Sequence, residues 1–132
     1  MLKLTRKTEY ALIALRHLHL VDENEVVSAK DIAAQYHIPQ PLLAKVLQEL
    51  SRHDFVKPVQ GPKGGYSLKT KRDNITMTQF FELMEGPLGI MDCYFDSNCE
   101  LLDNCNIRSP IQRLNENMRN MFDEMTLNDV TC

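Results

Sequence analysis

Three cysteines in the C-terminal half of the chain have a spacing that could hold a metal centre. Cys93, Cys99 and Cys105 are each separated by five residues, within a stretch (90–107) that has no helical or strand periodicity. Thiolates are soft ligands that suit iron–sulfur clusters and zinc. The spacing is wider than in the CxxC knuckles typical of structural zinc sites. It therefore favours a loop around a larger group, an iron–sulfur cluster of two or four irons, with metal-free redox-sensing thiols as the alternative.

Three thiolates leave such a cluster short of one ligand. A histidine shortly after Cys105 would complete the set, but residues 106–108 are Asn, Ile and Arg. The fourth ligand must come from Glu9, a histidine such as His37, another thiol or a small molecule. The terminal Cys132 is expected to be incidental, and Glu9 can also be read as an ordinary exposed acid on a helix.

Composition excludes several classes of protein. The chain has 132 residues, enough for one domain, and no apolar run approaches the 18 residues of a membrane span. Charged residues interrupt the first twenty positions, so we expect no secretory signal, no membrane partner and a cytoplasmic location. We find no Ser/His/Asp set, phosphate-binding loop or paired catalytic carboxylates, so an enzyme is not expected. An electron carrier would leave the basic N-terminal half without a role.

Charge is distributed unevenly along the chain. Residues 1–72 carry twelve Lys/Arg and seven Asp/Glu (net +5), whereas residues 73–132 carry three and eleven (net −8), which together make the overall −3. Such asymmetry indicates an anionic partner for the first half and a different task for the second. We therefore divide the chain at this point into a DNA-binding part, 1–72, and a part, 73–132, that carries the cysteine loop and a dimerisation helix.

The first half has the element order of a winged helix-turn-helix domain. A helix over 4–20, capped by Thr5, is followed by a short helix that Ser28 caps and Pro39 ends. A third helix runs from Gln40 to about residue 54. Its predicted buried stripe is Leu42, Leu43, Val46, Leu47 and Leu50.

A glycine-rich turn over 61–65 then joins two short β segments, 55–59 and 66–69, in a hairpin. This order predicts a mainly α fold with a two-stranded β wing. A helical protein-interaction domain of similar element order is the alternative.

In a winged helix-turn-helix domain the second helix of the pair enters the major groove of double-stranded DNA. Exposed residues of that helix would contact bases or phosphates, the hairpin would lie along the DNA backbone or in the minor groove, and basic residues at the chain start would bind phosphates. A solvated charged surface is the alternative for each single residue. The predicted DNA-binding residues are Lys3, Arg6, Gln40, Leu42, Lys45, Gln48, Gln60 and Lys63.

The C-terminal part is expected to form two further helices. The first covers 76–85, capped by Thr76 or Asn74, and the second is a long helix over 109–125. Apolar residues recur in the long helix at spacings of three, four, three and four, as in a coiled-coil seam. This pattern predicts a homodimer whose two heads bind the half-sites of a palindromic operator, with a core-facing helix as the alternative. The seam residues are Ile111, Leu114, Met118, Met121 and Met125.

Several motifs together resemble the winged-helix iron–sulfur transcription regulators of bacteria typified by IscR, NsrR and RirA. The motifs are LTRKTEYAL at 4–12, Asp-Ile-Ala at 31–33, GPKGGY at 61–66 and the three loop cysteines. The resemblance covers nearly the whole chain.

The resemblance implies a homodimer with crossed C-terminal helices, in which each cysteine loop lies close to the DNA-binding domain of the other subunit. Cys93, Cys99 and Cys105 match the cluster cysteines of this family, and Glu9 matches the position where NsrR-like members offer a carboxylate from the other subunit. The histidine ligand of IscR is missing, and Gln60 replaces an arginine expected beside the wing glycines. We therefore expect an operator different from that of IscR.

Overall fold

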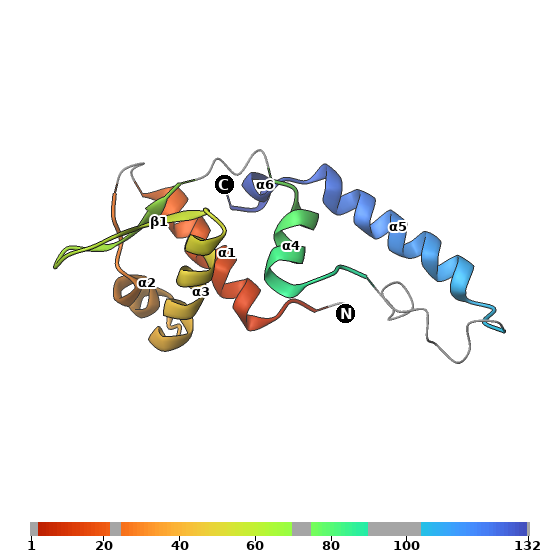
Figure 1. The fold of residues 1–132 in the computed structure, drawn as a ribbon, viewed down its shortest axis with the longest axis horizontal. Helices are drawn as coiled ribbons and strands as arrows, with labels where there is room; N and C mark the ends of the chain where they lie inside the picture. Colours follow the sequence, from red (N-terminus) through yellow and green to blue (C-terminus); the bar gives the residue numbers. More distant parts are fainter. Residues whose placement is uncertain (1–2, 22–24, 70–74, 90–103, 132) are drawn as a thin grey trace.

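The computed structural model describes residues 3–21, 25–69, 75–89 and 104–131, so Cys93, Cys99 and Cys132 lie outside the described residues. Figure 1 shows α1–α3 and the β hairpin at one end and the long α5 extending towards the other. The predicted mainly α, winged-helix architecture is confirmed. The elements are α1 (Arg6–Leu20), α2 (Ala29–Tyr36), α3 (Gln40–Arg52), β1 (Val56–Val59), β2 (Gly65–Leu68), α4 (Met77–Glu85), α5 (Arg108–Glu124) and α6 (Leu127–Thr131).

Hydroxyl side chains begin three of the helices, as the sequence predicted. The Thr5 hydroxyl accepts from the backbone N–H of Thr8 (3.3 Å), and that of Ser28 accepts from Asp31 (3.1 Å). Thr76, rather than Asn74, caps α4, and it forms a complete capping box with Gln79. Each cap satisfies backbone donors that a helix start otherwise leaves without partners.

The turn between α2 and α3 sets the angle at which α3 is presented. His37 adopts a left-handed backbone (φ 56°), and its N–H donates to the carbonyl of Ala33. Pro39 then caps α3, which ends at Arg52, slightly earlier than the predicted residue 54. The earlier end follows from Asp54, which has φ 62° and so cannot continue the helix.

The wing is a two-stranded antiparallel sheet in which Val56 pairs with Leu68 and Val59 with Gly65. Glycine is required at Gly61, where φ is 110°, and at Gly65, where a Cβ atom would collide with the carbonyl oxygen of Val27. Val27 exchanges two backbone hydrogen bonds with Tyr66 (2.8 and 2.9 Å). The segment before α2 therefore supports the base of the wing.

One core joins the two parts of the chain. Leu127 of α6 and Phe80 of α4 are fully buried in the same apolar cluster as Leu15 of α1 and Leu47 of α3. The start of α4 is fixed to the end of α5 by a hydrogen bond from the N–H of Met77 to the carbonyl of Met125 (2.8 Å). Residues on both sides of position 72 share this core. The division at residue 72 therefore separates two proposed roles and not two independently packed domains.

The prediction that Leu42 belongs to the buried stripe of α3 was wrong. Leu43, Val46, Leu47 and Leu50 are buried, but the side chain of Leu42 is 47% exposed. Successive residues of an α-helix are about 100° apart around its axis, so Leu42 points away from the direction of Leu43. Leu42 was also predicted to be an exposed residue of the DNA-binding helix, and its exposure is confirmed.

Candidate nucleic-acid interface and sensor site

The outward face of α3 is exposed and polar. Pro41, Lys45, Gln48 and Arg52 follow one another at spacings of four, three and four, opposite the buried stripe, and all are exposed. Lys45 and Gln48 were predicted for DNA binding, as were Gln40 and Leu42, which are exposed in the first turn. Arg52 was missed, although the spacing that relates Lys45 to Gln48 continues to it. The face offers hydrogen-bond donors and positive charge along the whole helix.

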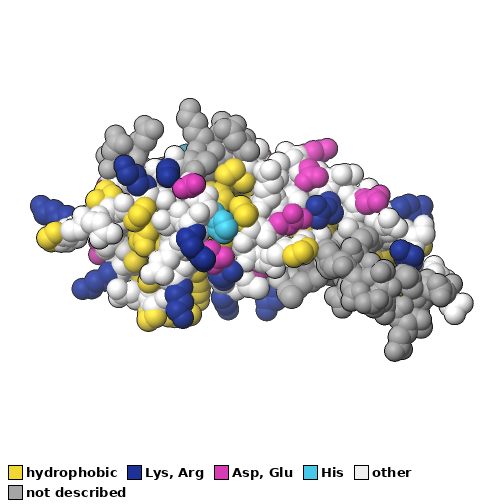
Figure 2. All heavy atoms as spheres, in the orientation of Figure 1, with side chains coloured by type: hydrophobic (Ala, Val, Ile, Leu, Met, Phe, Trp, Pro, Cys, Tyr) yellow, Lys and Arg dark blue, Asp and Glu magenta, His cyan; other side chains and the backbone are white. Residues whose placement is uncertain are grey.

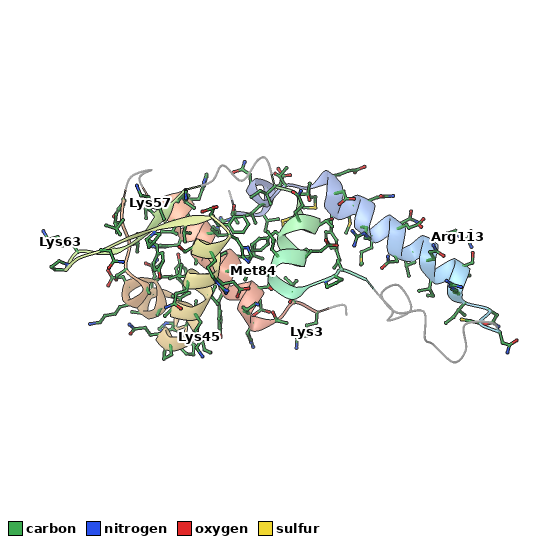
Figure 3. The ribbon with its side chains drawn as sticks, viewed as in Figure 1. Lys3, Lys45, Lys57, Lys63, Met84 and Arg113 are labelled. Atoms are coloured by element: carbon green, nitrogen blue, oxygen red, sulfur yellow. The ribbon has the colours of Figure 1, made fainter. Side chains whose placement is uncertain are left out.

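The wing adds a second exposed group. Gln60 and Lys63 both lie in the exposed turn between β1 and β2. Figure 3 shows Lys63 at the tip of the hairpin and Lys45 on α3, both at the end of the molecule remote from Arg113 of α5. In Figure 2, Lys and Arg side chains are prominent around this end, and more of the Asp and Glu side chains lie over the α5 end. The wing and α3 therefore form one candidate surface for a polyanion.

Lys3 and Arg6 are located elsewhere, at the start of α1. The guanidinium of Arg6 pairs with the carboxylate of Glu9 (2.9 Å, Nη1 to Oε2). Lys3 lies beside the N-terminus and lines a cavity of about 290 Å³ with Phe81 and Glu85. The structure therefore brings Arg6, a predicted phosphate ligand, together with Glu9, a predicted cluster ligand.

Two polar contacts join α1 to elements on either side of it. The N–H of Thr5 donates to Glu85 Oε1 at the end of α4 (2.7 Å). The ammonium of Lys7 pairs with Glu49 Oε1 of α3 (3.2 Å). The start of α1 is therefore linked to both α4 and α3. The sequence could not reveal the Thr5–Glu85 contact, because its partners are 80 residues apart.

Two of the four predicted cluster ligands, Cys105 and Glu9, can be placed. Cys105 carries a free, half-buried thiol three residues before α5 begins at Arg108, and the Glu9 side chain is 37% exposed. Among the described residues no three His, Cys, Asp or Glu side chains form a metal-binding group. Three thiolates suit an iron–sulfur cluster, because its irons bind soft anionic sulfur ligands, and a carboxylate would supply a harder anionic oxygen donor as the fourth ligand. The α5 start has no side-chain cap, and a helix N-terminus favours anionic groups nearby.

The inner face of α5 packs on α4 mainly through polar and aromatic contacts. Arg119 Nη1 pairs with Glu82 Oε1 (2.7 Å) and donates to the carbonyl of Leu88 (2.8 Å). The ring of Phe122 packs edge-on against Phe81, with centroids 5.2 Å apart, and Asn115 is buried. The face of α5 that packs on α4 therefore adjoins the predicted seam, since Met118 lines a cavity with Phe81 and Phe122.

The predicted seam forms an apolar stripe along α5. Leu114 is 54% exposed and Met121 51% exposed, and Met125 is also exposed, whereas Ile111 and Met118 are half-buried. Ile107, one turn before Ile111, extends the stripe and was not predicted. Exposed apolar side chains in a line along an otherwise polar helix are typical of a surface that packs against a partner.

The comparison with known families agrees with this geometry. A family model named Rrf2 and described as an iron-dependent transcriptional regulator matches residues 4–132. The chain belongs to the Rrf2 family. As an Rrf2 protein it is a helix-turn-helix transcriptional regulator and not an enzyme. The predicted resemblance to the IscR and NsrR regulators is confirmed.

Rrf2 relatives match over almost the whole chain. A helix-turn-helix regulator of Aquifex aeolicus is 36% identical over 124 residues, covering 92% of this chain and 85% of its own. The regulator NsrR of Geobacillus kaustophilus is 30% identical over 131 residues, covering 98% and 89%.

Solved structures of Rrf2 proteins confirm the fold. CymR, the global cysteine regulator of B. subtilis, matches with a TM-score of 0.76 and 25% identity, over 99% of this chain and 97% of its own. IscR of T. potens matches with a TM-score of 0.70 and 24% identity, over 97% and 85%. None of the helices in the described part of the chain is both long and apolar enough to span a membrane.

Proposed function

We propose that this Rrf2 protein is a homodimeric regulator whose affinity for a palindromic DNA operator is set by an iron–sulfur cluster. The observation that supports it most is the position of Cys93, Cys99 and Cys105, which all lie inside the range matched by an iron-dependent family. When bound, a cluster would supply a centre that responds to iron supply, redox state, oxygen or nitric oxide.

DNA recognition is assigned to α3 and the wing. Lys45, Gln48 and Arg52 lie on one exposed line of α3, and Lys63 is in the exposed wing turn. An α-helix fits the major groove, and glycines in the hairpin allow its backbone to approach phosphates closely. In a dimer held by paired α5 helices, two such heads would contact two half-sites related by the same two-fold axis.

Three thiolates would hold the cluster, with Glu9 of the other subunit as the fourth ligand. The carboxylate of Glu9 pairs with Arg6 in this structure, so it would have to exchange this partner for iron. The pair is solvent-exposed, and exposed ion pairs contribute at most about 1 kcal/mol. Breaking the Arg6–Glu9 pair therefore requires little free energy.

Fixing Glu9 would position α1, and α1 is joined to α3. The Lys7–Glu49 pair and the shared core of Leu15 and Leu47 make this connection within one subunit. Ligation of Glu9 would therefore restrict the orientation of α3 relative to the partner head. A coupling free energy of about 1–3 kcal/mol changes affinity about 5- to 150-fold, which is enough for a regulatory switch.

A regulator that senses through metal-free thiols or a small ligand is the second candidate. The structural relative that favours it is CymR of B. subtilis, which is described as a global cysteine regulator. The free, half-buried thiol of Cys105 fits this candidate as well. The two candidates share the DNA-binding surface and differ in whether iron and sulfide are bound.

The DNA-binding surface can be tested through its salt dependence. We expect affinity for duplex DNA to fall steeply with salt, because each phosphate contact releases counterions. Lys45→Ala and Arg52→Ala should each lower affinity and reduce the slope of log affinity against log salt by about 1. Fluorescence anisotropy with a labelled duplex at several salt concentrations measures both quantities.

Arg113→Ala provides a matched control, because Arg113 is an exposed cation on α5 at the other end of the molecule. This variant should have the wild-type slope. An equal loss of slope in all three variants would show a general charge effect and would contradict the assignment of α3 as the recognition helix.

A further inference from the structure

One apolar side chain stands out on the recognition helix. Leu42 is 47% exposed in the first turn of α3, whereas Leu43 beside it is fully buried in the core. Its N–H donates to the carbonyl of Pro39 (3.1 Å), and the prolines at 39 and 41 restrict the backbone just before it. The position of Leu42 is therefore well defined, although its side chain contributes little to the core.

The place of Leu42 in α3 is one that meets base edges. In helix-turn-helix proteins, residues in the first turns of the recognition helix lie deepest in the major groove. Leu42 is three residues before Lys45 and seven before Glu49, on the edge of α3 where Glu49 pairs with Lys7 of α1. The surroundings are thus polar and charged, which suits a nucleic acid better than an apolar protein partner.

Leucine has no hydrogen-bonding group, which limits what it can recognise. In the major groove the one apolar feature of a base pair is the C5-methyl group of thymine. Against guanine, cytosine or adenine, the same side chain would cover donors and acceptors without replacing their hydrogen bonds to water, which is unfavourable. Thymine is therefore the base that an exposed leucine favours here.

We propose that Leu42 is a specificity-determining residue that selects a thymine in each half-site by contact with its C5-methyl group. The inference rests on α3 being the recognition helix, as proposed above. It adds a base preference that neither Lys45 nor Gln48 provides, because both recognise polar atoms.

The test removes the methyl group alone. Duplexes are first selected from a random-sequence library with the full-length protein, and each thymine of the selected site is then replaced by deoxyuridine. One thymine position, the same in both half-sites, should be sensitive to this replacement. There the wild-type affinity should fall about fourfold for each half-site that is changed, which is the effect of burying one methyl-sized group. In Leu42→Ala the same replacement should have no effect.

Leu20→Ala is the matched control, since Leu20 is the same residue type and is even more exposed (64%), at the far end of α1. It should keep the full preference for thymine over deoxyuridine. Thermal unfolding of both variants should match the wild type, because neither side chain lies in the core.

Two results would overturn this proposal while leaving the DNA-binding function intact. One is a selected site in which no deoxyuridine replacement weakens binding, and the other is a Leu42→Ala variant that retains the wild-type methyl dependence. Absence of any salt-dependent duplex binding would overturn the DNA-binding function itself, and this inference with it. That result would be seen at the selection step, before any thymine is replaced.

Discussion

Replacing Leu114 and Met121 with glutamate is expected to give a monomer with on the order of 100-fold lower operator affinity. Both residues belong to the uncovered apolar stripe of α5 and are about half-exposed, so the subunit itself should fold normally. Two carboxylates per helix would be buried against an identical stripe in a dimer, at a high desolvation cost. Loss of the second head removes the gain from binding two linked half-sites, which reaches 10²–10⁴. Sedimentation and operator titration measure the two effects.

The control places the same charge on the other side of the helix. Gln112→Glu with Asn120→Glu also adds two carboxylates to exposed positions of α5, outside the stripe. This variant should remain dimeric. A dimeric Leu114→Glu, Met121→Glu variant, or a monomeric wild type, would contradict the assignment of the stripe as the dimer interface.

The second large effect is expected at the cysteines. Protein prepared without oxygen should contain iron and sulfide and show charge-transfer absorption near or above roughly 400 nm. Changing Cys105 to alanine should abolish both, because the remaining thiolates cannot replace a missing cluster ligand. The same loss is expected for Cys93→Ala and Cys99→Ala. Iron and sulfide analysis beside the absorption spectrum provides the measurement.

Cys132→Ala is the control for the loss of a thiol as such, and it should retain full iron and sulfide. Glu9→Ala should lose iron to a chelator faster than the wild type does if its carboxylate is the fourth ligand. A colourless, iron-free wild type would exclude the cluster and leave the metal-free sensor as the explanation.

Local patterns allowed much of the fold to be predicted. Thr5, Ser28 and Thr76 begin helices because a hydroxyl can accept a backbone N–H three residues later, which is a short-range property. The wing could be located from its glycines, because a glycine-rich turn is also a short-range feature of the sequence. Leu42 shows where such reasoning fails, because an apolar residue next to a buried one was assigned to the stripe without regard to its direction around the helix.

Contacts between distant residues could not be predicted in this way. The Thr5–Glu85 and Lys7–Glu49 contacts that place α1 between α4 and α3 depend on packing. The exposure of the α5 stripe depends on which face Arg119 and Phe122 hold against α4. Arg52 is different, since helical spacing from Lys45 would have been sufficient to predict it. For Cys93 and Cys99, spacing and residue type remain the basis of the prediction.

Control of DNA binding by the cluster can be measured as operator affinity with and without bound iron. A duplex selected by the anaerobic protein would be titrated with that same preparation before and after removal of iron by a chelator. We predict that affinity differs by about tenfold or more between the two forms, and that Cys105→Ala binds like the chelated wild type with or without chelator. Equal affinity of the two wild-type forms would contradict control of DNA binding by an iron–sulfur cluster.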